Sequence, residues 1–151
     1  MLTVVTGPPC SGKTTYVRQH ARPGDVIVDF DVIAQAVGSP VSHGHDDAIW
    51  KVAIEARDAA LRTAVRCHQT MHATAWIIDS RPTPAARKNY QAAGGRIVDL
   101  TAPAAELHRR ADEAGRPASW HNRIDQFLAA GAETALQTRT RWLADALADR
   151  P

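Results

Sequence analysis

The feature that most constrains this 151-residue chain is a glycine-bordered stretch of eight residues near its start. Gly7 to Thr14 read GPPCSGKT, which fits the pattern G-x-x-x-x-G-K-S/T. The stretch follows a short β-branched run, Leu2–Thr6, and precedes a segment of helical composition, Lys13–Ala21. Glycines in such a turn let successive N–H groups point inwards, and the helix that follows adds positive potential at its N-terminus. The sequence therefore predicts a phosphate-binding loop.

The lysine and the threonine at the end of this loop predict a bound nucleotide. Lys13 is expected to reach the β- and γ-phosphates of ATP, and the Thr14 hydroxyl is expected to hold Mg²⁺. A glycine-rich turn that binds nothing is the alternative, but such a turn does not need this pair of residues. Cys10 is expected to fill space in the loop rather than to act as a nucleophile. The predicted ATP contacts are Gly7, Pro8, Pro9, Cys10, Ser11, Gly12, Lys13, Thr14 and Thr15.

Hydrophobic runs alternate with helix-length amphipathic segments along the rest of the chain, which predicts an α/β fold with a parallel sheet. Each predicted strand is short and apolar, as strands buried on both faces of a sheet are. The strands are Leu2–Thr6, Asp25–Asp29, Ala75–Asp79 and Arg96–Leu100. The helices are Lys13–Ala21, Val32–Val37, Asp46–Thr70, Thr83–Ala93, Pro103–Ala114, Ser119–Ala130 and Ala132–Ala148. In the longest helix the predicted buried stripe comprises Ile49, Val52, Ala53, Ala56, Ala60, Ala64 and Cys67.

Composition limits the class of protein. A chain of this length with 44% hydrophobic and 23% charged residues suits one soluble domain, which we place at residues 1–151. Cys10 and Cys67 are too few for a disulfide framework, and no apolar run approaches the roughly 18–20 residues of a membrane span. The net charge of +2 is scattered, which disfavours a long duplex-binding face. We expect a cytoplasmic protein with no membrane contact and no obligate protein partner.

Acidic residues follow two of the predicted strands. The second strand ends in Asp29-Phe30-Asp31, and the third ends in Asp79-Ser80-Arg81. Ligands of open α/β sheets lie outside the carboxyl ends of the strands, so these side chains are expected close to the phosphates. For Asp29 and Asp31 the alternative is capping of the short helix that follows, because Asp is a favoured N-cap residue.

Together these motifs resemble the small P-loop kinases that include shikimate and gluconate kinases and the 5′-hydroxyl polynucleotide kinases. The resemblance rests on the loop Gly7–Thr14, the acidic pair Asp29 and Asp31, the apolar strand ending in Asp79, and an arginine-bearing segment, residues 108–117. It implies a three-layer P-loop NTPase fold whose sheet of about four strands has the order 2-3-1-4. It also implies a helical lid over about residues 106–120.

The resemblance further implies ATP-dependent transfer of the γ-phosphate to a hydroxyl. Asp31 would orient the attacking hydroxyl and accept its proton. Asp29 and Asp79, with Thr14, would act near Mg²⁺, partly through its waters. Asp29 would also contact the substrate.

The predicted lid carries the arginines that would neutralise charge during the transfer. Arg110 and Arg116 match the lid positions of these kinases, and Arg109 is the competing candidate. The alternative is that all three arginines are solvated, since arginines are common near helix ends.

The acceptor is predicted from the residues around the expected cleft. Arg81 would grip an anionic acceptor, as an arginine in nucleoside monophosphate kinases does, or it is an exposed loop residue. Basic residues of two helices would line an acidic groove or form solvated faces: Arg57, Arg62, Arg66, Arg87 and Lys88. The chain lacks the glycine triplet of shikimate kinases, and its acidic pair suits a hydroxyl acceptor that needs a base. The leading prediction is a phosphate-bearing acceptor with a free hydroxyl, such as the 5′-hydroxyl of a polynucleotide or of a nucleotide-like molecule.

Two other functions stay open. One is a small-metabolite or nucleoside monophosphate kinase, and the other is an ATP-hydrolysing P-loop protein without a hydroxyl acceptor. A guanine reader of the N-K-x-D kind is not present at Val98–Thr101, where a GTPase switch would carry one. The pairs His43/His45 and His68/His72 suggest a metal site less than a polar loop and a helix surface. His43 and His45 are expected near the cleft, where they would help to hold an acceptor.

Overall fold

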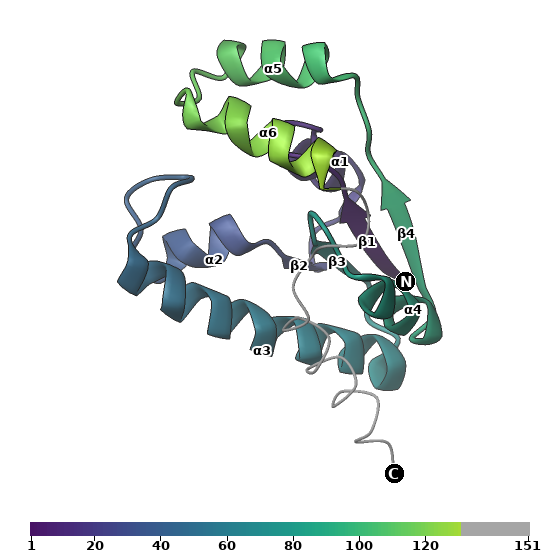
Figure 1. The fold of residues 1–151 in the computed structure, drawn as a ribbon. Coiled ribbons are helices and arrows are strands. Elements are labelled where there is room, and N and C mark those ends of the chain that lie inside the picture. Colours follow the sequence, from purple (N-terminus) through teal and green to yellow (C-terminus); the bar gives the residue numbers. More distant parts are fainter. Residues whose placement is uncertain (131–151) are drawn as a thin grey trace.

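The computed structural model describes residues 1–130 of the chain and shows a parallel sheet flanked by helices (Figure 1). The four strands are hydrogen-bonded in the order β2-β3-β1-β4, and every pair is parallel. They span Leu2–Thr6 (β1), Val26–Val28 (β2), Ala75–Ile78 (β3) and Gly95–Asp99 (β4). The predicted fold class and strand order are confirmed.

Six helices are present in the described part of the chain, close to their predicted positions. They are α1 (Lys13–His20), α2 (Phe30–Ala36), α3 (Asp47–Met71), α4 (Pro84–Ala92), α5 (Ala104–Glu113) and α6 (Ser119–Ala129). The start of α2 was predicted two residues too late, because Asp29 rather than a later residue is its N-cap. Among these helices none is both long and apolar enough to span a membrane. The predicted helix Ala132–Ala148 lies outside the described residues.

Side chains of the strands alternate between the two faces of the sheet, and each face is covered by different helices. Leu2 and Val4 of β1 point to the face covered by α3 and α4, where they join the largest apolar cluster. Val5 points to the opposite face and packs with Val17 of α1 and Trp76 of β3. The molecule therefore has three layers, with α1 on one side of the sheet and α3 and α4 on the other.

Burial on both faces was predicted for every strand, and this is wrong for the two edge strands, β2 and β4, because no residue of β4 is buried and only one of β2 is. Val26 and Ile27 are 38% and 47% exposed, whereas Val28 is buried. β2 forms one edge of the sheet and has a single neighbour, β3. The apolar composition of an edge strand does not distinguish it from a central one, which is why the sequence pattern failed here.

The predicted buried stripe of α3 is partly wrong. Ala53 and Ala64 are buried as expected, but Val52 is 55% exposed. The remaining buried residues of this helix are Arg57, Leu61 and Val65. The prediction left Arg57 out of the buried side because it is charged. The buried side of α3 in fact includes Arg57, so the predicted buried side was turned about the helix axis from the observed one.

Leu61 and Val52 provide a matched test of this packing. Leu61→Ala should lower the free energy of unfolding by about 2–5 kcal/mol, because it removes a fully buried side chain from the main core. Val52→Ala should change it by less than about 0.5 kcal/mol. Urea unfolding of the parent and both variants measures the two effects, and a large loss in Val52→Ala would contradict the observed orientation of α3.

Candidate functional site

A cavity of about 1040 Å³ lies at the carboxyl ends of the strands. Its wall comprises the loop after β1, the start of α1, residues of α2, the end of β3, and parts of α3, α5 and α6. Figure 1 shows α5 and α6 on one side of this edge of the sheet and α2 with α3 on the other. Open parallel sheets bind their ligands at this edge, so the cavity is the candidate site.

The loop after β1 has a shape that only glycine permits at its first position. Gly7 adopts φ 137°, and a Cβ atom there would lie 2.1 Å from the carbonyl oxygen of Leu100. The Gly7 N–H donates to the carbonyl of Ser80 at 3.1 Å. Gly12, at φ 90°, precedes the first turn of α1. The loop is thus held between the ends of β3 and β4, with the N-terminus of α1 directed at the cavity.

Lys13 lies within this loop and is bonded to the loop itself. Its ammonium donates to the carbonyls of Gly7 and Pro8 at 2.9 and 2.7 Å. Burial lowers the pKa of Lys13 to about 8, although nearby Cys10, Asp29 and Asp31 act in the opposite direction. A partly buried cation at the N-terminus of a helix is the expected arrangement for a site that takes an anion.

Two further loop residues fit the phosphate-binding interpretation. The Ser11 hydroxyl is buried, and within the described residues it has no hydrogen-bond partner. Cys10 is in the left-handed region at φ 61°, and burial raises the pKa of its thiol. A raised pKa disfavours the thiolate, which agrees with the prediction that Cys10 fills space.

Thr14 and Asp29 bring a hydroxyl and a carboxylate together. Thr14 Oγ1 lies 3.4 Å from Asp29 Oδ2, and burial raises the pKa of this aspartate. Asp29 Oδ1 accepts the Asp31 N–H at 3.0 Å, so the capping alternative is correct for Asp29. Hard oxygen donors of this kind suit Mg²⁺, so the residues present fit the predicted ion.

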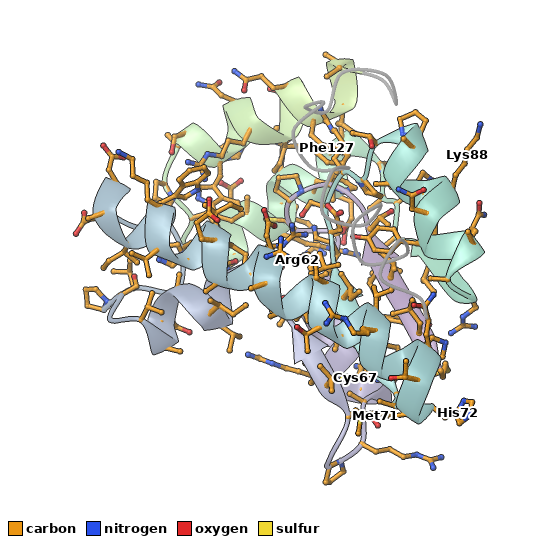
Figure 2. The ribbon with its side chains drawn as sticks, turned by 90° about the horizontal axis from the view of Figure 1, so that it is seen from below. Arg62, Cys67, Met71, His72, Lys88 and Phe127 are labelled. Carbon is orange, nitrogen blue, oxygen red and sulfur yellow. The ribbon has the colours of Figure 1, made fainter. Side chains whose placement is uncertain are left out.

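Asp79 lies at the end of β3 and is held by two other elements. Its Oδ2 accepts the hydroxyl of Tyr90 at 3.1 Å, and Nη2 of Arg57 is 3.7 Å away. Only 3% of the Arg57 side chain is exposed, yet it contributes to the cavity wall. Arg62, labelled on α3 in Figure 2, and Arg66 are not among the described residues of the wall. Of the three arginines predicted on this helix, Arg57 alone reaches the site.

Two histidines of the loop before α3 contact Asp31, one at each oxygen of its carboxylate. Its Oδ2 lies 2.8 Å from His43 Nδ1, and its Oδ1 lies 3.0 Å from His45 Nε2. Burial would raise the pKa of Asp31, but the two imidazoles outweigh it and hold this pKa below its usual range. The sequence placed both histidines near the cleft and missed their contact with Asp31. The spacing H-x-H in a loop between two helices was the only signal.

Two of the three candidate lid arginines lie on the cavity wall. Arg110 pairs with Glu106 at 2.7 Å, and its Nη1 lies 3.4 Å from the carbonyl of Cys10 in the phosphate loop. The guanidinium of Arg116 lies 4.7 Å from the centre of the Trp120 ring, and both residues line the cavity.

Arg109 and Arg81 are engaged elsewhere. Arg109 pairs with Glu106 and Glu113 and is 54% exposed, outside the described wall. Arg81 donates to the carbonyl of Phe127, and its guanidinium lies 3.8 Å above that ring (Figure 2 labels Phe127). The geometry therefore gives the predicted substrate contact of Arg81 no support.

Lys13 makes proton uptake a test of the site. In the free protein its pKa of about 8 leaves it largely neutral at about pH 9, compared with the ordinary value of 10.5. Bound phosphates favour the charged form, so ATP binding between about pH 8 and pH 10.5 should take up as much as one proton for each site. Calorimetric titrations in two buffers of different ionisation enthalpy measure this uptake. In Lys13→Arg the guanidinium stays charged, and equal heats are expected in both buffers. Equal heats for the parent would contradict the assignment.

Comparison with known proteins agrees with this architecture. The chain matches 32 chains of solved structures. One is a chain in the structure of the Pnkp1/Rnl/Hen1 RNA repair complex, with a TM-score of 0.61 and 13% identity. The match covers 99% of this chain and 46% of that chain, so this chain spans less than half the length of its structural neighbour. No curated protein matches.

The solved structure confirms the predicted fold, and a family model also matches the chain. That model covers residues 2–148, almost the whole chain. The loop at Gly7–Thr14 and the parallel order β2-β3-β1-β4 are the features that such a P-loop protein requires. The chain belongs to the AAA domain family.

Proposed function

We propose that the protein is an ATP-dependent phosphotransferase that moves a γ-phosphate to a hydroxyl acceptor. One observation carries this proposal: a single cavity is lined both by the phosphate loop and by Asp31, a carboxylate outside that loop. Lys13 and Asp31 are close enough for the charge of one to affect the pKa of the other. An acceptor hydroxyl needs a group that orients it and assists its deprotonation. A hydrolase uses such a group on water, so the acceptor assay below separates the two functions.

ATP is proposed to lie with its phosphates in the loop. The contacts would come from Gly7, Pro8, Pro9, Cys10, Ser11, Gly12, Lys13, Thr14 and Thr15. Thr14 and Asp29 would hold Mg²⁺, with Asp79 acting through water, and the ion would neutralise part of the phosphate charge. Asp79 is fixed for this role by Tyr90 and Arg57.

The lid is proposed to comprise about residues 106–120, and Arg110 and Arg116 are its proposed catalytic arginines. Both arginines line the cavity that Asp31 and the phosphate loop also line. Phosphoryl transfer spreads negative charge over the equatorial oxygens, and guanidinium groups stabilise that charge.

The proposed acceptor is a phosphate-bearing molecule with a free hydroxyl, and a polynucleotide 5′ end is the leading candidate. Arg57, Arg123 and the lid arginines make the wall basic, and Trp120 adds an aromatic surface. Arginine and aromatic side chains are the groups that hold single-stranded nucleic acid. The similarity to a chain from an RNA repair complex supports the same class.

A second candidate is ATP hydrolysis without an acceptor, which the AAA domain family match favours. A small-metabolite or nucleoside monophosphate kinase is a third. For the three candidates, a cytoplasmic location and the lack of an obligate protein partner remain predictions.

The acceptor assay separates these functions. The parent is incubated with γ-labelled ATP and three acceptors: 5′-hydroxyl oligonucleotides, nucleosides and small polyols. Label should enter the oligonucleotide, and Asp31→Asn should lower its rate by about 10²–10⁴-fold at nearly unchanged ATP affinity. Asp47→Asn, in an exposed position on α3, is the matched control and should behave like the parent.

Each result of this assay has one interpretation. Label released only as inorganic phosphate would favour the hydrolase, and label in a nucleoside or polyol would favour a small-molecule kinase. Equal rates for the parent and Asp31→Asn would remove Asp31 from the mechanism.

The lid arginines give an independent prediction. Arg110→Ala and Arg116→Ala should each lower transfer by about 10²–10³-fold, as loss of a charge-stabilising donor does. Arg109→Ala should leave the rate unchanged, because Arg109 lies off the wall. Transfer rates at saturating ATP measure all three variants. A loss confined to Arg109→Ala would move the catalytic role to that residue.

A further inference from the structure

We propose that His43 is the group that takes the proton from the acceptor hydroxyl, with Asp31 holding its imidazole in the required tautomer. This inference rests on the proposed phosphotransferase function and deepens it. It replaces the expectation that Asp31 itself receives the proton.

The hydrogen bonds of Asp31 decide the tautomer of His43. His43 Nδ1 lies 2.8 Å from Asp31 Oδ2, and an ionised carboxylate can only accept a hydrogen bond, so Nδ1 carries the hydrogen. In a neutral imidazole the other nitrogen, Nε2, then has a free lone pair. Within the described residues no hydrogen bond occupies this Nε2.

His45 holds the other oxygen of Asp31 and is a positioning residue. Its Nε2 lies 3.0 Å from Asp31 Oδ1, and its Nδ1 lies 2.7 Å from Ser39 Oγ, so both ring nitrogens have partners. Only 2% of its side chain is exposed, and it does not contribute to the described cavity wall. With this oxygen held by His45, the carboxylate keeps its orientation towards His43.

His43, in contrast, is placed to meet a substrate. It lines the same cavity as Asp31 and the phosphate loop, and 25% of its side chain is exposed. Its ring stands edge-on to Trp120 of α6, with the ring centres 5.1 Å apart. The contact with Asp31 and the contact with Trp120 orient the ring from two sides.

The chemistry balances without another reactant. The hydroxyl proton passes to His43 Nε2 while the hydroxyl oxygen forms a bond to the γ-phosphorus. The bond between that phosphorus and the bridging oxygen breaks, and its electron pair leaves with ADP. The imidazolium that forms carries its positive charge beside the Asp31 carboxylate, which stays ionised throughout. Serine proteases use the same division of roles between an aspartate and a histidine.

His43→Asn separates this role from mere support of Asp31. The asparagine amide nitrogen can occupy the place of Nδ1 and keep the hydrogen bond to Asp31, but nothing replaces Nε2. Transfer to the acceptor should fall by about 10²–10⁴-fold with ATP affinity unchanged. His72→Asn is the control: His72 is exposed at the C-terminus of α3 (Figure 2) at φ 56°, a conformation that asparagine tolerates.

A second measurement does not depend on activity. Long-range ¹⁵N–¹H spectra of the nucleotide-free parent at neutral pH report the tautomer of each histidine. The His43 signals are assigned by their loss in His43→Asn. A protonated Nδ1 with an unprotonated Nε2 is expected, and a ring protonated at Nε2 alone would overturn the proposal.

The outcomes distinguish a failure of the role of His43 from a failure of the proposed phosphotransferase function. If the parent transfers phosphate and His43→Asn matches its rate, His43 is not the proton acceptor, although the phosphotransferase stands. If the parent transfers phosphate to none of the hydroxyl acceptors, the function and the role of His43 both fall.

Discussion

The close approach of backbone to backbone at Gly7 is the constraint on which the site depends. β1 is a central strand, with β3 on one side and β4 on the other, so the chain leaving it has little room to turn. Gly7 donates to Ser80 beyond β3, and a side chain at this position would meet the Leu100 carbonyl beyond β4. Three strand ends therefore set the position of the phosphate loop, and the groups that follow those strands lie within reach of it.

The site combines buried charges that need a ligand to be fully satisfied. Lys13 turns back onto two loop carbonyls, and burial lowers its pKa to about 8. Burial disfavours the charged form of Asp29 as well, and therefore raises the pKa of its carboxyl. A protein gains no stability from such groups on their own. The arrangement fits the proposed binding of anionic phosphates and a divalent cation, which would supply the missing interactions.

Local patterns in the sequence were sufficient for the fold class and for about half of the cavity wall, and the strand order followed from the resemblance to small P-loop kinases. The loop motif, Asp29, Asp31 and Asp79 were found because each lies at a strand end, where topology alone decides the neighbours. Arg57 was predicted either to line a groove or to be solvated, and its burial was not predicted, because its contact with Asp79 is made 22 positions away in the sequence. The contact of Arg81 with Phe127 of α6 was not predicted for the same reason. Contacts of this kind follow from tertiary packing, which periodicity does not encode.

Cys10 connects the loop after β1 with the helices α5 and α6. It belongs to the phosphate loop, and it also packs against an apolar cluster formed by Leu107 and Ala111 of α5 with Ile124 of α6. The loop and the pair of helices α5 and α6 therefore share one packed side chain. A larger residue at position 10 would crowd the contact between α5 and α6 as well as the loop, so the two parts of the cavity wall cannot change shape independently at this point.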